Sequence, residues 1–172
     1  STLFPYTTLF RSIQKKPITE AQALKKLGDL CAKAEHCSGE IMEKMYKMGL
    51  PEDAKTRIME KLTKYSYVDD ERFTNAYVYD KIRYNKWGRR KIEQALWAKQ
   101  IDNKIANLVL DAVPDEEYLS VLRPLLKSKY PTIKAETDYE RSVKLIKYAL
   151  GKGFTFDLIK QCIDAAVDED DI

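Results

Sequence analysis

The fold of this chain can be read from residues 41–62, which run IMEKMYKMGLPEDAKTRIMEKL. Apolar residues occur there with successive spacings of 4, 5, 4, 4 and 4, at Ile41, Met45, Leu50, Ala54, Ile58 and Leu62. Steps of four place side chains on one stripe of a helix, so the pattern predicts two amphipathic helices. The single step of five predicts a turn between them. Gly49 suits the left-handed end of the first helix, and Pro51 suits the start of the second.

The same spacings recur twice, at offsets of 51 and 53 residues. The second set is Ile92, Leu96, Ile101, Ile105, Val109 and Val113. The third set is Leu145, Ala149, Phe154, Leu158, Cys162 and Ala166. Gly153 lies at the third turn, whereas the middle copy has Gln100 there, so we expect the middle turn to be made differently. The recurrence predicts three copies of one helical unit.

Another amphipathic segment precedes each predicted helix pair, at about 20–34, 70–85 and 115–130. Their apolar residues are Leu24, Leu27, Leu30 and Cys31, then Phe73, Ala76, Tyr77 and Ile82, then Leu119, Leu122 and Leu126. We expect Asp70 and Asp115 to act as N-caps. Because a helix with one apolar stripe must bury it against neighbours, each unit is predicted to be a three-helix module in an all-α protein.

The predicted boundaries are 18–66 for the first module, 67–113 for the second, which is basic, and 114–167 for the third. An acidic tail, 168–172, is expected to be a frayed, solubilising terminus.

The first twelve residues look foreign to this pattern. Thr2 to Ser12 read TLFPYTTLFRS, and all eleven residues match one reading frame of a common short-read sequencing adapter. A native apolar N-terminal strand is the alternative. We treat 1–12 as a non-native segment and base no fold or function argument on it.

Composition and motifs argue against an enzyme. The chain has 172 residues, of which 44% are hydrophobic and 33% charged, with no apolar run long enough for a membrane span and no secretory signal pattern. Three cysteines without disulfide spacing fit a reducing cytosol, so we expect a cytoplasmic protein. His36 has only Cys31 and Cys37 nearby, and Cys162 could join them only by leaving its apolar stripe. Because structural zinc needs four ligands, we expect no metal. The sequence has no Gly-rich phosphate loop, no GxSxG and no paired-Cys redox motif, so we expect no cofactor and no catalytic site.

Positive charge is concentrated in residues 80–99, which carry a net charge of +5, whereas 100–172 carry −4. The basic residues are Lys81, Arg83, Lys86, Arg89, Arg90, Lys91 and Lys99. Aromatic residues are interleaved with them or lie nearby, namely Tyr77, Tyr79, Tyr84, Trp87 and Trp97. This combination can bind phosphates or an acidic protein. It can equally be a solvated helix face over an aromatic core, which is where we expect Tyr77 and Trp97.

Arg89 and Arg90 follow Gly88 at a predicted helix start. Two arginines there oppose the helix macrodipole, so local helix stability does not explain them. They are therefore candidates for partner contact.

The middle of the chain contains two motifs. The run Tyr67-Val68-Asp69-Asp70-Glu71-Arg72-Phe73 has the pattern aromatic, aliphatic, Asp-Asp-x-x-Phe, which resembles the signature of the RecX family of regulatory proteins. The run from Asn85 to Ile92, with Gly88 four residues before Ile92, resembles its Gly-x-x-x-Ile segment. Residues 34–41 and 149–154 are similar to the first and third units, although Cys37 and Gly39 depart from the commoner forms.

The resemblance implies three tandem modules in an elongated, curved helical-repeat protein. It also implies a regulator, expected to be monomeric, that docks in the groove of a RecA–DNA filament. There it would suppress ATP hydrolysis, strand exchange and coprotease activity, and so modulate recombination and DNA repair. The expected partner-binding residues are Lys81, Arg83, Lys86, Trp87, Arg89, Arg90, Lys91 and Lys99. The alternative is a stand-alone helical nucleic-acid-binding protein.

Overall fold

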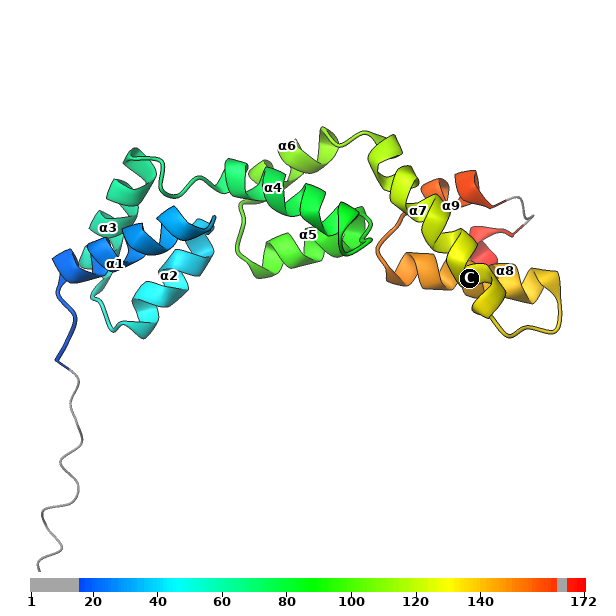
Figure 1. Ribbon diagram of the computed structural model, residues 1–172, viewed down its shortest axis with the longest axis horizontal. Coiled ribbons are helices and arrows are strands. Elements are labelled where there is room, and N and C mark those ends of the chain that lie inside the picture. Colours follow the sequence, from blue (N-terminus) through cyan, green and yellow to red (C-terminus); the bar gives the residue numbers. More distant parts are fainter. Residues whose placement is uncertain (1–15, 164–166) are drawn as a thin grey trace, which may run out of the picture.

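The computed structural model describes residues 16–163 and 167–172, and within these ranges the chain is entirely helical. Its helices form three consecutive groups along an elongated, arched body (Figure 1). The first module holds α1 (Glu20–Lys33), α2 (Ser38–Lys47) and α3 (Glu52–Lys64). The second holds α4 (Asp70–Arg83), α5 (Arg89–Ala98) and α6 (Asn103–Asp111). The third holds α7 (Asp115–Lys129), α8 (Asp138–Gly151) and α9 (Phe156–Cys162), with two 3-10 helices, η1 (Tyr130–Thr132) and η2 (Glu169–Asp171).

The predicted all-α repeat is confirmed. The domain boundaries expected from the sequence stay predictions. The segment 1–12 lies outside the described residues.

The predicted apolar stripes form the core. All six stripe residues of the first copy are buried. In the other two copies, among the described stripe residues, only Ile105 and Cys162 are half-buried, and Ala166 lies outside the described residues. On α4 the prediction was wrong at Ala76, which is exposed, while Val78 is buried in its place.

The core has two parts. The first module buries its own cluster around Leu27, Ile41 and Ile58. The second and third modules share one continuous cluster, which extends from Phe73 to Val167 and also includes Cys37 of the first module. Since a shared core couples two modules mechanically, we expect the second and third modules to unfold together.

The three inter-helix turns have one geometry. Gly49, Gln100 and Gly153 all have positive φ, at 72°, 62° and 96°. The amide after each one donates to the carbonyl five residues back, at 3.3 Å in the first turn, 3.1 Å in the second and 3.2 Å in the third. This is the Schellman motif, in which the two residues five apart also make an apolar contact. The two apolar residues separated by a step of five in the sequence are the ones that make this contact.

The expectation for Gln100 was therefore wrong. The middle turn is made in the same way as the others, with a non-glycine residue held in the left-handed region.

The expected N-caps were also wrong by one residue. Asp69 caps α4 by accepting from the Arg72 amide at 3.0 Å, and Pro114 precedes α7. Asp70 instead accepts from the amide of Ser38 at 2.7 Å and from its hydroxyl at 2.5 Å. Because the α2 N-cap makes no side-chain cap bond of its own, Asp70 of the second module completes the start of a helix in the first.

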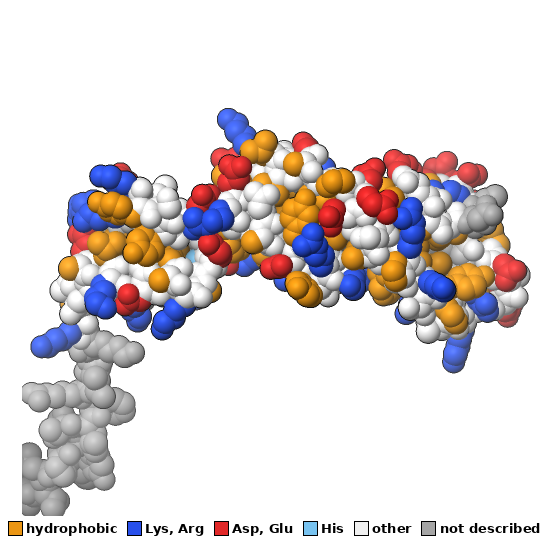
Figure 2. Space-filling view, turned by 45° about the horizontal axis from the view of Figure 1, so that its top comes forward, with side chains coloured by type: hydrophobic (Ala, Val, Ile, Leu, Met, Phe, Trp, Pro, Cys, Tyr) orange, Lys and Arg blue, Asp and Glu red, His pale blue; other side chains and the backbone are white. Residues whose placement is uncertain are grey.

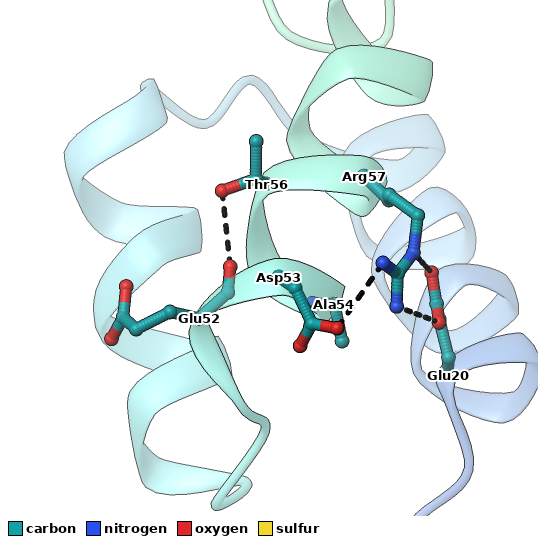
Figure 3. Close-up of polar contacts among 6 residues, drawn as sticks. All are labelled: Glu20, Glu52, Asp53, Ala54, Thr56 and Arg57. Atoms are coloured by element: carbon teal, nitrogen blue, oxygen red, sulfur yellow. Dashed lines mark hydrogen bonds and ion pairs between the residues drawn. The ribbon is translucent and has the colours of Figure 1, made fainter.

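Within the first module, an ion-pair group joins α3 to α1. The Arg57 guanidinium donates to both carboxylate oxygens of Glu20, at 2.9 and 3.0 Å, and to Asp53 at 3.3 Å (Figure 3). The two oxygens match the fork of the guanidinium, so the contact links the two helices at one defined point on the surface.

The acidic tail is not frayed, contrary to expectation. Val167 is buried, and Ile172 packs against the core of the second and third modules. The Tyr139 hydroxyl donates to the Asp171 carboxylate at 3.0 Å. These contacts hold the tail against α8.

Candidate partner-binding surface

The modules join through one repeated docking geometry. At the second junction, the amides of Gly88 and Arg90 at the start of α5 donate to the carbonyls of Lys152 and Gly153, at 2.9 and 3.0 Å. At the first junction, the start of α2 lies against the equivalent turn, and the Cys37 thiol lies 3.8 Å from the Lys99 carbonyl. In both cases the N-terminus of one module's second helix meets the second turn of the following module.

Glycine permits this close approach. A Cβ added at Gly88 would lie 2.2 Å from the Phe154 nitrogen, and one at Gly39 would lie 2.3 Å from the Lys99 oxygen. Both partner atoms are backbone, so they cannot move aside as a flexible side chain would. The family motif glycine Gly88 therefore has a packing role between modules.

The docking explains the two arginines that helix stability alone did not. The carbonyls at the C-terminal end of α8 face the start of α5, so their negative partial charge offsets its positive one. Arg89 is half-buried and pairs with Glu93 at 2.7 Å and Asp111 at 2.6 Å. The pKa of Arg89 is raised, and the hydrogen bond to Glu93 is the largest cause of that rise. These contacts within the protein account for Arg89, which the sequence left unexplained, whereas Arg90 is exposed.

Two other predicted basic residues are also neutralised within the protein. Lys99 pairs with Glu40 of the first module at 2.7 Å, and Arg83 lies 3.5 Å from Glu117. Burial would raise the pKa of Glu40, but hydrogen bonds from Lys99 and His36 outweigh it and lower the pKa. These pairs hold modules together, so they are poorly suited to exchange for a partner.

Four lysines remain around the loop between α4 and α5. The ammonium groups of Lys81 and Lys91 lie 5.0 and 4.8 Å from the Trp87 ring centroid. Lys86 donates to the Arg83 carbonyl at 2.5 Å, and Lys152 to the Asn85 carbonyl at 3.5 Å. In the part of the chain that the structure describes, none of these lysines forms an ion pair with a carboxylate. We call Lys81, Lys86, Lys91 and Lys152 the junction lysine cluster.

Sequence reasoning identified three members of this cluster and missed Lys152. It belongs to the third module, and only the docking of the α8–α9 turn on the start of α5 brings it there. No local signal marks it. Its offset of 53 residues from Lys99, the equivalent turn position, could have indicated that it lies at a junction.

The aromatic residues divide between core and surface. Tyr77 is half-buried and stacks on Phe73 with ring centroids 5.6 Å apart. Trp97 is 75% exposed, so the expectation that it lies in the core was wrong. Trp87 is half-buried and engaged by two ammonium groups, which favours a role in positioning lysines. On the face shown in Figure 2, hydrophobic side chains are exposed among interleaved basic and acidic ones.

Two of the remaining motif residues belong to the core. Phe73 and Ile92 are buried in the core of the second and third modules. Tyr67 is exposed in the segment before α4, and its amide donates to the Leu62 carbonyl at 2.9 Å. The signature thus specifies a helix start and the docking of one module on another, rather than a reactive group.

His36 and the cysteines make no metal cluster within residues 16–163 and 167–172. The His36 imidazole Nδ1 lies 3.0 Å from the Glu40 carboxylate, and Cys37 is fully buried. Burial raises the pKa of the Cys37 thiol, which disfavours the thiolate that reactive cysteines need. No described helix is both long and apolar enough to cross a bilayer.

Comparison with known proteins identifies the family. Residues 69–110 match the model of the RecX second three-helix domain, and residues 115–163 match that of the third. The regulatory protein RecX of Clostridium perfringens (strain 13) is 30% identical over 162 residues, covering 86% of this chain and 76% of that protein. This chain belongs to the RecX family. The resemblance predicted from the two central motifs is therefore confirmed.

Some other RecX proteins align at lower identity. RecX of Acinetobacter baylyi is 26% identical, covering 81% of this chain and 85% of that protein. RecX of Clostridium botulinum (strain Eklund 17B) is also 26% identical, but the chain spans only 60% of its length. The crystal structure of RecX from Lactobacillus salivarius superposes with a TM-score of 0.78 at 20% identity, covering 83% of this chain and 93% of that chain. That likeness concerns the fold alone.

Proposed function

We propose that this RecX protein binds the RecA filament in the cytoplasm as a monomer and inhibits its ATPase, strand-exchange and coprotease activities. On this proposal it modulates recombination and DNA repair without catalysing a reaction. Family membership supports the choice of partner. The observation that carries the mode of binding is the junction lysine cluster, four cations at the junction of the second and third modules that have no carboxylate partner among the described residues.

The cluster suits a partner that presents several negative charges in a row. Phosphates of filament DNA and carboxylates on a filament surface both meet this description. Because Lys81 and Lys91 are both held against Trp87, their ammonium groups are positioned before binding, which reduces the entropy lost when a complex forms. Arg90 lies on the adjoining helix start and can add a bidentate contact.

The proposal is tested by co-sedimentation with RecA filaments assembled on single-stranded DNA. We expect the wild-type protein to sediment with filaments, and the double variant Lys81→Glu with Lys91→Glu to bind more weakly. The matched control is Lys134→Glu, an exposed lysine outside the cluster, which should bind like wild type. Wild-type protein that stays in the supernatant at saturating filament concentrations would refute the proposal.

Stand-alone nucleic-acid binding is the second candidate, and the same lysines favour it. The two differ in salt dependence on bare single-stranded DNA. If phosphate neutralisation alone carries binding, each lost lysine should reduce the slope of log K against log salt by about 0.7. Binding to bare DNA as tight as binding to filaments would favour this second function.

A further inference from the structure

Trp97 and Tyr46 occupy equivalent positions in two modules. They are 51 residues apart, which is the offset between the first and second apolar stripes, and each is the second-last residue of its helix. Each side chain is 75% exposed. Neither the core nor the junction lysine cluster uses them, so the fold presents two large aromatic side chains to solvent at a repeated position.

The backbone of both residues is fixed. The carbonyl of Tyr46 accepts from the Gly49 amide at 2.9 Å, and that of Trp97 accepts from the Gln100 amide at 2.9 Å. Both bonds belong to the Schellman turns described above. Because the backbone is already ordered, binding costs little further backbone entropy there. Trp and Tyr also have only two χ angles to fix, which favours their use as anchors.

Two surface hollows lie beside the two aromatic residues, and the first of them spans the first junction. One hollow of about 530 Å³ is lined by Tyr46, Lys55 and residues at the start of α2. A second of about 640 Å³ is lined by Trp97 and the start of α6. Ala98 and Gln100 line both hollows, so the two hollows adjoin at the turn between α5 and α6. We call the surface formed by these two adjoining hollows the inter-module groove.

The charge of this groove differs from that of the junction lysine cluster. Its acidic lining residues are Glu40, Glu43, Glu52 and Asp102, and its basic ones are Lys55, Lys99 and Lys104. Lys55 pairs with Glu52 at 2.5 Å and Lys99 with Glu40 at 2.7 Å. The formal balance is thus slightly negative, so a polyanion such as nucleic acid gains nothing here and is disfavoured.

We propose that the inter-module groove binds an apolar, uncharged or weakly basic segment of the protein partner, with Trp97 as the main anchor and Tyr46 as the second. Trp and Tyr are the residue types that most often dominate binding at protein interfaces. The assignment rests on the proposed function, because the partner is the protein component of the filament. It divides the contact between two surfaces: the groove meets protein, and the junction lysine cluster meets negative charge.

The test compares affinity for RecA filaments with affinity for the bare oligonucleotide. Trp97→Ala should weaken filament binding by about tenfold or more, and Tyr46→Ala by less, with bare-DNA affinity unchanged within about twofold. The matched control is Tyr65→Ala, another exposed aromatic, which lies outside the groove and should bind filaments like wild type. Unchanged circular dichroism and melting temperature establish that each variant is folded, and Trp97→Phe should recover most of the affinity.

The outcomes separate the two proposals. Filament binding by Trp97→Ala equal to wild type would overturn the groove and leave the proposed function standing. Equal losses on filaments and on bare DNA would assign the groove to nucleic acid. A wild-type dimer in analytical ultracentrifugation that Trp97→Ala abolishes would assign it to a second copy of this chain. Wild-type protein with no filament affinity would overturn the proposed function, and with it the groove's assigned partner.

Discussion

Gly88→Ala should undock the second module from the third. The added Cβ would lie 2.2 to 2.4 Å from backbone atoms of Gly153 and Phe154, well inside normal contact distance, so the turn must move by about 1 Å. Two hydrogen bonds, of 2.9 and 3.0 Å, would then lengthen or break, each worth about 1 kcal/mol. Overpacking against the fully buried Phe154 adds about 1–3 kcal/mol.

Lower chain entropy in the unfolded alanine variant offsets about 0.4–1 kcal/mol of this. We therefore expect Gly88→Ala to lower the free energy of unfolding by about 2–4 kcal/mol. The assay is urea denaturation followed by far-UV circular dichroism. Gly151→Ala is the matched control, because a Cβ there meets nothing within 4 Å near the same turn, and it should be neutral or stabilising. If Gly88→Ala is as stable as Gly151→Ala, the account of the junction is wrong.

Three further predictions concern charge and burial. Arg89→Glu should lower the free energy of unfolding by about 1–2 kcal/mol, because it loses two ion pairs. Arg90→Glu should change that free energy by less than about 0.5 kcal/mol. Equal effects of the two variants in urea denaturation would contradict the different structural roles assigned to the two arginines. The Tyr118 hydroxyl is buried without a hydrogen-bond partner among the described residues, and burial raises its pKa to about 12. Wild-type stability should therefore fall as pH rises from about 10 to 12, and Tyr118→Phe should be at least as stable at neutral pH and lack that alkaline loss. Because the pKa of Glu40 is lowered from 4.5, its ion pair with Lys99 should stabilise the protein above pH 4.5 and lose this effect as the pH falls through the lowered pKa. Glu40→Gln should therefore make the free energy of unfolding depend less on pH in the acid range. An unchanged pH dependence would argue against a stabilising Glu40–Lys99 pair.

Helix periodicity predicted most of the fold. The stripe residues face the core because spacing of four along a helix places them on one side, and that requirement is local. The turn positions followed from the same pattern. The pattern could not predict the left-handed conformation of Gln100. Residue type only changes how readily a residue adopts positive φ, and here the repeated tertiary setting imposes that conformation on a glutamine.

The candidate surface was harder to predict, because it depends on contacts between modules. Arg89 and Lys99 looked available in the sequence, but Asp111 and Glu40, distant along the chain, neutralise them. Trp97 follows the buried Leu96 in the sequence. Because successive residues point in different directions around a helix, Leu96 faces the core and Trp97 faces solvent. Lys152 reaches the loop of the second module only through docking, which leaves no mark on local spacing.

The proposed function makes this chain a RecA regulator whose junction lysine cluster faces negative charge in the filament. Steady-state ATP hydrolysis by RecA on single-stranded DNA measures that regulation, with wild-type protein compared with the folded double variant Lys81→Glu with Lys91→Glu. We expect wild type to suppress hydrolysis in a saturable manner, and the variant to need about tenfold or more protein for the same effect. An unchanged ATPase rate at saturating wild-type protein would contradict the proposed function.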